Sequence, residues 1–193
     1  MGAASDGSDS MAVSVAERSD WPDLEALICV VSDQKKGTSS TSGMDGSVQT
    51  SELLQHRIEK VVPERMKWMK SAIKQKYFDS FSALTMANSN QFHTICLDTQ
   101  PPIFYLNNFS HSIIAVIKKL NRASKAKGNG CLAAYTFDAS PTAVIYAPQR
   151  NMHKLLNLIL HYFPLPGLRG RYPKIPTKMQ RGHLYTSERF CQP

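Results

Sequence analysis

The stretch CLAAYTFDASPTAVIYAP, residues 131–148, decides the fold. Two apolar runs, rich in aromatic and β-branched residues, flank the tripeptide ASP, and each run has the length of a strand. A connection this short joins antiparallel strands, since parallel strands need a long crossover. The stretch therefore predicts two adjacent antiparallel strands, with the carboxylate of Asp138 where the first strand ends.

Working outward, the rest of the chain reads as one more strand and a series of helices. LEALICVVS, residues 24–32, is a continuous apolar run typical of a buried strand. Residues 51–73 carry apolar side chains at helical spacing, and Pro63 predicts that this helix is kinked or split in two. Further helices are predicted for residues 77–99, 110–124 and 151–163. This pattern indicates an α+β class with an antiparallel sheet packed with helices.

Two helix starts can be predicted from their capping residues. A helix is expected to begin near Gly43, because Ser42 can cap it and Asp45 follows three residues later as in a capping box. Ser110 is the expected N-cap of the helix over residues 110–124.

The two ends of the chain differ in composition from the part between them. Residues 1–19 are small and polar and predict an arm, whereas residues 20–163 predict the α+β domain. Residues 164–193 are basic, rich in proline and without periodicity, which predicts an irregular tail. The chain shows no secretory signal, no apolar run long enough for a membrane and no CxxC pair among its four cysteines. We therefore expect a cytoplasmic protein with reduced thiols and no metal site.

The formal net charge of +8 fits nucleic acid, a membrane surface or an anionic small molecule as a partner. Much of this charge lies in the tail after residue 163. Nucleic-acid binding through this tail is therefore a weaker alternative. The aromatic residues are not interleaved with basic ones as in an RNA-binding sheet. An anionic small molecule is the expected partner, and neither a membrane nor nucleic acid is.

The loop KKGTSSTSGM is the first candidate site. Its lysines are Lys35 and Lys36, and its hydroxyl residues before the expected helix start are Ser39, Ser40 and Thr41. The N-terminus of a helix exposes N–H groups and the positive end of the helix dipole. Together these groups can hold a diphosphate. The alternative is an ordinary serine-rich loop with solvated lysines.

Asp138 is the second candidate, and it also has two interpretations. A loop carboxylate between strands ordinarily accepts hydrogen bonds from its own turn. A carboxylate close to bound phosphates is unfavourable unless it handles a proton or meets a cationic transition state. His93 and Asp98 are five residues apart on a predicted helix, do not share a face well, and are interpreted as structural.

Four longer segments, VVSDQKKGTSSTSGM, TSELLQHRIEKVVPERM, SNQFHTICLDTQPPIFYLN and AYTFDASPTAV, resemble in this order the C-terminal half of the mevalonate diphosphate decarboxylases. This family belongs to the superfamily of galactokinase, homoserine kinase, mevalonate kinase and phosphomevalonate kinase. The resemblance implies the C-terminal α+β domain of that superfamily. It also implies an ATP-dependent carboxy-lyase of isoprenoid and sterol biosynthesis. Such an enzyme converts (R)-5-diphosphomevalonate to isopentenyl diphosphate with ADP, phosphate and CO2.

The resemblance assigns roles to both candidate sites. Asp138 matches the aspartate that orients or deprotonates the tertiary hydroxyl of the substrate, so it is the implied catalytic residue. The residues that match or adjoin the family's diphosphate-binding loop are Lys35, Lys36, Ser39, Ser40 and Thr41. ATP and Mg²⁺ are the implied cofactors, but their main binding residues lie upstream of Met1 in the family pattern and are expected to be absent from this chain. A homodimer is implied for the intact enzyme.

Three residues depart from the family pattern. Ser140 and Thr142 replace the Gly and Asn of the DAGPN turn, and Asn88 replaces the Asp of DSNQFH. If the turn requires positive φ at position 140, Ser140 costs on the order of 1 kcal/mol and shifts Asp138. With the ATP-binding half missing, the lone chain is predicted to be inactive. The alternative is a non-catalytic interaction or regulatory module that pairs with a full-length decarboxylase.

Overall fold

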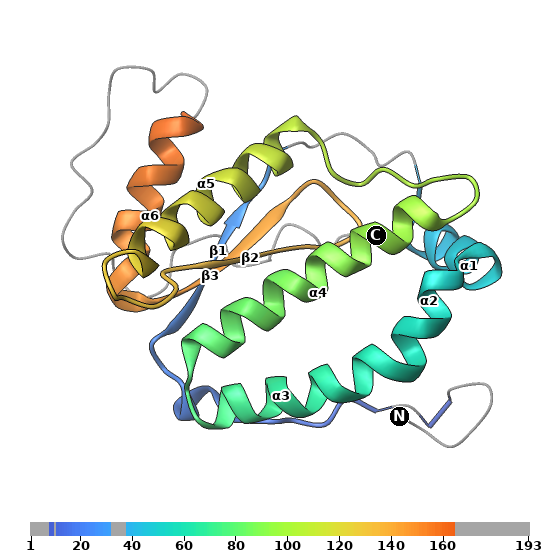
Figure 1. Ribbon diagram of the computed structural model, residues 1–193, viewed down its shortest axis with the longest axis horizontal. Coiled ribbons are helices and arrows are strands. Elements are labelled where there is room, and N and C mark those ends of the chain that lie inside the picture. Colours follow the sequence, from blue (N-terminus) through green and yellow to red (C-terminus); the bar gives the residue numbers. More distant parts are fainter. Residues whose placement is uncertain (1–7, 10, 32–37, 165–193) are drawn as a thin grey trace, which may run out of the picture. The chain divides into compact units, whose positions relative to one another are not determined.

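The structure, a computed structural model, describes residues 8–9, 11–31 and 38–164 (Figure 1). The chain divides into two compact units, residues 1–157 and 158–193, and all elements discussed below lie in the first unit except the end of the last helix. The predicted tail, apart from residue 164, lies outside the described residues. None of the helices in the described ranges combines the length and the apolar character needed to span a bilayer.

Three antiparallel strands form the sheet in the order β1-β3-β2. The strands are β1 (Leu24–Cys29), β2 (Ala134–Phe137) and β3 (Ala143–Pro148). Leu27 of β1 pairs with Ile145 of β3, which in turn pairs with Tyr135 of β2, and all three side chains are buried. The two strands predicted around Asp138 and the antiparallel sheet are therefore confirmed.

Helices make up most of the remaining described chain. A short 3₁₀ helix, η1 (Arg18–Asp20), precedes the sheet, and the α-helices are α1 (Ser40–Thr50), α2 (Glu52–His56), α3 (Val62–Lys74), α4 (Phe78–Asp98), α5 (Asn108–Lys125) and α6 (Gln149–Tyr162). A π-helical segment, η2 (Arg57–Val61), lies between α2 and α3. Helices and an antiparallel sheet give the α+β class that the sequence predicts.

The segment around Pro63 forms two α-helices, as predicted, but a π-helical turn joins them. The Val62 N–H donates to the carbonyl of Arg57, five residues earlier, instead of to a carbonyl four residues earlier. Proline has no N–H to donate and its ring crowds the preceding turn. Pro63 lies at the start of α3, directly after the π-helical segment, where its missing donor is tolerated.

The start of α5 differs from the prediction by three residues. Asn107, not Ser110, is the N-cap, and its Oδ1 accepts the Ser110 N–H at 3.0 Å. Ser110 instead completes a capping box with Asn107. Its Oγ also donates to the carbonyl of Pro141 at 3.0 Å, which ties the first turn of α5 to the turn between β2 and β3.

Helix α4 runs beside β2 and covers that edge of the sheet (Figure 1). Ser89 Oγ accepts the backbone N–H of Phe137 at 3.0 Å, and the Tyr135 hydroxyl donates to Asn90 Oδ1 at 3.1 Å. An edge strand presents backbone groups that need partners, and here α4 supplies one for the Phe137 N–H. Since Phe137 immediately precedes Asp138, the same contact fixes the point at which β2 presents its carboxylate.

Helix α5 holds the chain where it enters β2. The buried side chain of Asn121 donates to the carbonyl of Ala133 at 2.7 Å and accepts the Leu132 N–H at 2.8 Å. The amide thus pairs with the backbone as a neighbouring strand would. Apolar side chains of α5 and the sheet fill the centre of the unit, and among the fully buried ones are Ile113, Ile117, Tyr135 and Ile145.

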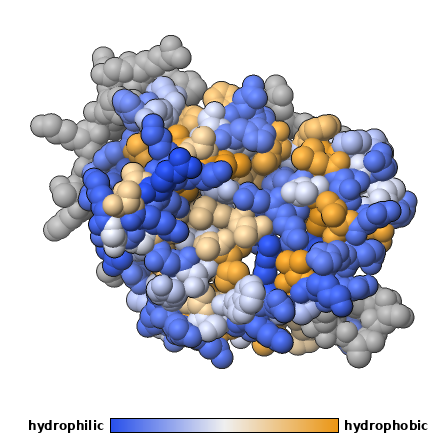
Figure 2. Space-filling view, viewed as in Figure 1, coloured by the Kyte–Doolittle hydropathy of each residue, from blue (hydrophilic) through white to orange (hydrophobic). Residues whose placement is uncertain are grey.

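Not every large apolar side chain is buried. Figure 2 shows apolar groups on one face of the molecule, separated by polar ones. The exposed large apolar residues include Ile28, Trp68, Leu97 and Phe104. Exposed apolar residues that are scattered singly are common on protein surfaces.

We predict that the Ser89 contact contributes measurably to stability. Ser89→Ala leaves the buried Phe137 N–H without its acceptor, so the free energy of unfolding in urea should fall by about 1–3 kcal/mol. Thr94→Ala is the matched control on the same helix, because the exposed Thr94 hydroxyl bonds only to the carbonyl of Asn90 four residues earlier. The control should change the free energy by less than about 0.5 kcal/mol. Equal effects of the two substitutions would contradict this assignment.

Candidate functional site

Helix α1 begins at Ser40 and not near Gly43, so the predicted start is three residues too late. Ser39 has extended backbone angles (φ −67°, ψ 157°), and its Oγ accepts the Ser42 N–H at 3.1 Å. Ser39 is therefore the N-cap, and Asp45 lies beyond the first turn. Several neighbouring hydroxyl residues can cap a helix, and the sequence alone does not distinguish among them.

This start places the hydroxyl residues at the positive end of α1. Ser40 and Thr41 belong to the first turn, and their side chains, like that of Ser39, are exposed. The Ser39 oxygen accepts a hydrogen bond from the helix, which leaves its own hydroxyl hydrogen to be donated outward. An anion is the ligand that such a helix start favours. The two predicted lysines, Lys35 and Lys36, lie outside the described residues.

Tyr105 joins the start of α1 to the segment that carries Asp138. Its hydroxyl donates to the carbonyl of Ser39 at 3.2 Å and lies directly against Gly43. Its ring belongs to a buried apolar cluster that also contains Ala139, the residue after Asp138; the other members are Cys96 and Ile103, with Phe92 packed against them. Tyr105 thus contacts the start of α1 directly and shares a buried cluster with the residue after Asp138.

Burial raises the pKa of the Tyr105 hydroxyl, and the nearby Cys96 thiol and Asp138 carboxylate raise this pKa further. The hydroxyl therefore keeps its proton and remains a hydrogen-bond donor. Nothing in the local sequence singles out Tyr105, because PPIFY indicates only where the preceding helix ends. A buried tyrosine needs a partner for its hydroxyl, which is the one signal that could have drawn attention to it.

The Asp138 side chain is exposed at the end of β2, and only one of its oxygens is held by the turn. Oδ1 accepts the Ala139 N–H at 2.7 Å, and the Ser140 N–H donates to the Asp138 carbonyl at 2.6 Å. Within the described part of the chain, Oδ2 has no hydrogen-bond partner. The hydrogen bond from the Ala139 N–H to Oδ1 gives Asp138 the structural role that is ordinary for an aspartate in a turn. Among the described residues, none blocks the second oxygen from a ligand.

The substituted turn after Asp138 shows no backbone strain. Lys76 is the only non-glycine residue with positive φ in the described ranges, so the condition under which Ser140 would be costly is not met. Ser140 Oγ accepts the Thr142 N–H at 3.3 Å. Both departures from the family pattern in this turn are thus accommodated by local hydrogen bonding.

His93 lies beneath the turn and is 9% exposed. Its ring packs edge-on against Phe92 and Phe137, with ring centroids 5.0 and 6.3 Å away. Burial lowers the pKa of His93, while a hydrogen bond with the Phe137 backbone and the charge of Asp138 raise it, and His111 lowers it. Burial is the largest effect, so the imidazole is neutral. Its Nε2 atom is buried without a hydrogen-bond partner among the described residues.

Asp98, at the end of α4, has a structural role. It accepts hydrogen bonds from the Ser51 hydroxyl at 2.7 Å and from the Leu53 N–H at 3.2 Å, and these bonds lower its pKa. Asp98 therefore supports the start of α2, which agrees with its interpretation from sequence.

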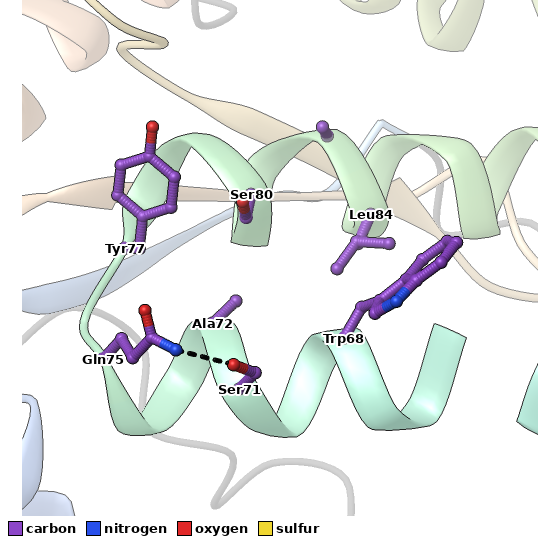
Figure 3. A pocket seen from close by; sticks show the side chains of 8 residues that line it. Trp68, Ser71, Ala72, Gln75, Tyr77, Ser80 and Leu84 are labelled. Atoms are coloured by element: carbon purple, nitrogen blue, oxygen red, sulfur yellow. Dashed lines mark hydrogen bonds between the residues drawn. The ribbon is translucent and has the colours of Figure 1, made fainter. Parts of the chain in front are cut away.

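The described residues contain no group of three His, Cys, Asp or Glu side chains that could hold a metal ion. An open hollow of about 350 Å³ lies between α3 and α4, where Trp68 and Leu84 lie side by side (Figure 3). No predicted site residue lines this hollow. The hydroxyl residues at the start of α1 and the Asp138 side chain after β2 are instead each exposed at the surface.

The fold and these exposed groups define a class of protein: an α+β domain whose antiparallel sheet ends in a carboxylate turn, with a hydroxyl-rich helix start joined to it. The family model for the mevalonate 5-diphosphate decarboxylase C-terminal domain matches residues 26–187. The chain therefore belongs to the family of mevalonate 5-diphosphate decarboxylase C-terminal domains.

Individual relatives support the same family. The diphosphomevalonate decarboxylase of Ganoderma lucidum is 55% identical over 164 residues, which are 85% of this chain and 41% of the relative. A solved mevalonate 5-diphosphate decarboxylase is 47% identical, with a TM-score of 0.79 over 90% of this chain and 44% of that structure. A solved complex of MDDEF with MVAPP, AMPPCP and magnesium is 26% identical, with a TM-score of 0.67 over 77% of this chain and 44% of that structure. The chain spans about two fifths of the length of the curated relatives it matches.

Two glycines of α1 test the contact between α1 and Tyr105. A Cβ atom at Gly43 would lie on the Tyr105 hydroxyl oxygen, whereas a Cβ at Gly46 would meet only the Thr99 methyl group at 3.5 Å. Gly43→Ala should therefore lower the free energy of unfolding by about 1–3 kcal/mol. Gly46→Ala should raise it by about 0.5–1 kcal/mol, because alanine favours the helix. Urea denaturation measures both, and stabilisation by Gly43→Ala would contradict the contact.

Neutral His93 predicts a pH dependence of stability. The folded pKa of His93 lies below its unfolded value of about 6.5, so the unfolded chain binds the proton first as the pH falls. The free energy of unfolding is therefore unaffected by His93 above its unfolded pKa and declines as the pH falls below about 6.5. His93→Asn should show a shallower decline of the unfolding free energy over this range than the unsubstituted chain. His56→Asn, on an exposed histidine, should keep the original decline, and equal slopes in all three proteins would refute the prediction.

Proposed function

We propose that this chain supplies the substrate-binding half of an ATP-dependent diphosphomevalonate decarboxylase. The observation that carries the proposal is the bridge made by Tyr105, which contacts the Ser39 carbonyl and packs with Ala139 beside Asp138. A diphosphate at the start of α1 would thereby share a surface with the carboxylate. Membership of the decarboxylase family supports the same reading.

The roles of the individual residues follow from their contacts. Ser39, Ser40 and Thr41 would bind the substrate diphosphate through hydroxyl donors and the positive end of α1, with Lys35 and Lys36 adding positive charge. Asp138 would accept the proton of the tertiary hydroxyl through its open Oδ2, while the Ala139 N–H on Oδ1 fixes the orientation of the carboxylate. Ser89 holds the backbone of Phe137, the residue before Asp138, and the His93 ring packs against the Phe137 ring.

We assign the nucleotide and the metal to no described residue of this chain. ATP with Mg²⁺ supplies the phosphoryl group in this proposal, and one solved relative contains AMPPCP and magnesium. No cluster of ligands suited to a metal ion occurs in the described ranges, and we derive no step through the metal. We also propose, from the family resemblance, a cytoplasmic location and a homodimeric intact enzyme. The lone chain should release no CO2.

A hybrid enzyme tests the proposal. The matching region of the Ganoderma lucidum decarboxylase is replaced by this chain's aligned segment, and ATP-dependent CO2 release from diphosphomevalonate is measured. The hybrid should be active, whereas the lone chain should not. Asp138→Asn in the hybrid should lower kcat by about 10²–10⁴-fold, because the carboxylate can no longer accept a proton.

Asp45→Asn is the matched control, since Asp45 is an exposed carboxylate of α1 beyond its first turn. It should leave kcat unchanged. A folded hybrid that keeps full activity with Asn at position 138 would remove Asp138 from the mechanism. A folded hybrid without any activity would refute the proposal that this chain supplies the substrate-binding half.

A further inference from the structure

Two arginines on the segment that faces α4 converge on a single oxygen atom. Arg57 Nη1 donates to Gln91 Oε1 at 2.7 Å, and Arg65 Nη1 donates to the same oxygen at 3.0 Å. Like charges held this close repel each other, and partial burial strengthens the repulsion. Both burial and the neighbouring Arg65 lower the pKa of Arg57. Such an arrangement needs a compensating negative charge.

The π-helical segment brings the two guanidinium groups together. Arg57 and Arg65 are eight residues apart, whereas about seven residues complete two turns of a regular α-helix. The π-helical turn takes up one extra residue, so both side chains face α4. Turns of this kind are frequent at functional sites. The backbone conformation, and not side-chain flexibility, therefore brings Arg57 and Arg65 together.

All hydrogen-bond acceptors of the pair are uncharged. Arg57 Nη2 donates to Asn88 Oδ1 at 2.7 Å, and Arg65 Nη1 also donates to the carbonyl of Ala87 at 3.3 Å. No carboxylate in the described part of the chain forms an ion pair with either arginine. Asn88 accepts a hydrogen bond from Arg57 but supplies no counter-charge.

The pair also keeps unused donors. Each guanidinium carries five N–H groups, and the hydrogen bonds to Asn88, Gln91 and Ala87 use fewer than half of those in the pair. Both arginines are partly exposed and Asn88 is exposed, so the donors are open to solvent. A guanidinium fork matches the oxygens of phosphate, and two such groups match the charge of a divalent anion.

We propose that Arg57, Arg65 and Asn88 form a binding site for a divalent oxyanion of the phosphate class. The anion supplies the negative charge that Asn88 does not, and the guanidinium groups bind it through N–H donors. This site is separate in its residues from the start of α1 and from Asp138. Its existence does not depend on the proposed decarboxylase function.

The test compares the unsubstituted full chain with Asn88→Asp. Thermal unfolding and calorimetric titration are measured with inorganic phosphate at mildly alkaline pH, with ionic strength held constant by sodium chloride. Phosphate should raise the unfolding temperature of the unsubstituted chain in a saturable manner, because it binds the folded state. Asn88→Asp places a carboxylate on Arg57 and should weaken phosphate binding at least about tenfold. The same variant should unfold at a higher temperature than the unsubstituted chain when phosphate is absent.

A second variant and a control keep the result interpretable. Arg65→Gln removes one cation without adding an anion, and it should also weaken phosphate binding at least about tenfold. Arg122→Gln changes an exposed arginine of α5 and should leave phosphate binding unchanged. If Asn88→Asp and Arg65→Gln retain the phosphate affinity of the unsubstituted chain, the anion binds elsewhere and the proposal is wrong. A phosphate effect no larger than that of chloride would also overturn it.

Discussion

The contact between α4 and the edge of β2 is the interaction on which the rest of this domain depends. An edge strand leaves backbone donors unpaired. Here the Ser89 hydroxyl oxygen accepts the N–H of Phe137, one residue before Asp138. His93, one helical turn further along α4, lies against the same residue. Asp138 can be exposed and still be well positioned, because the chain directly before it is held by buried groups of a helix 21 residues long.

Different faces of α4 serve different purposes. The face with Ser89 and His93 contacts the sheet, whereas the face with Asn88 and Gln91 receives Arg57 and Arg65. At its end, Asp98 holds the first residues of α2. One helix therefore connects the carboxylate turn, the start of α2 and the arginine pair. A substitution on any of these faces acts through a part of the chain that is distant in sequence.

Local patterns predicted the elements but not the contacts between them. Strand composition, helical periodicity and Pro63 indicate the sheet, the helices and the division between α2 and α3, because these signals are contained in a few neighbouring residues. Local sequence does not decide where α1 starts, since Ser39 and Ser42 are equally good caps. In the folded chain Ser39 is the cap, and Tyr105 packs against Ser39 and Gly43. The roles of Tyr105 and of the arginine pair could not be predicted, because each depends on side chains that meet only in the folded chain.

The departures from the family pattern show why distance from the predicted site is a poor guide to consequence. Ser140 and Thr142 follow Asp138 closely, yet the turn accommodates them with ordinary hydrogen bonds and no positive φ. Asn88 lies 50 positions before Asp138, and its Oδ1 accepts a hydrogen bond from Arg57. Because the amide is uncharged, Arg57 and Arg65 have only uncharged partners among the described residues. Both guanidinium groups donate to the same oxygen, and like charges held this close repel each other. The uncompensated charge therefore lies on the face of α4 that receives Arg57 and Arg65, where an anion can supply the negative charge that Asn88 does not.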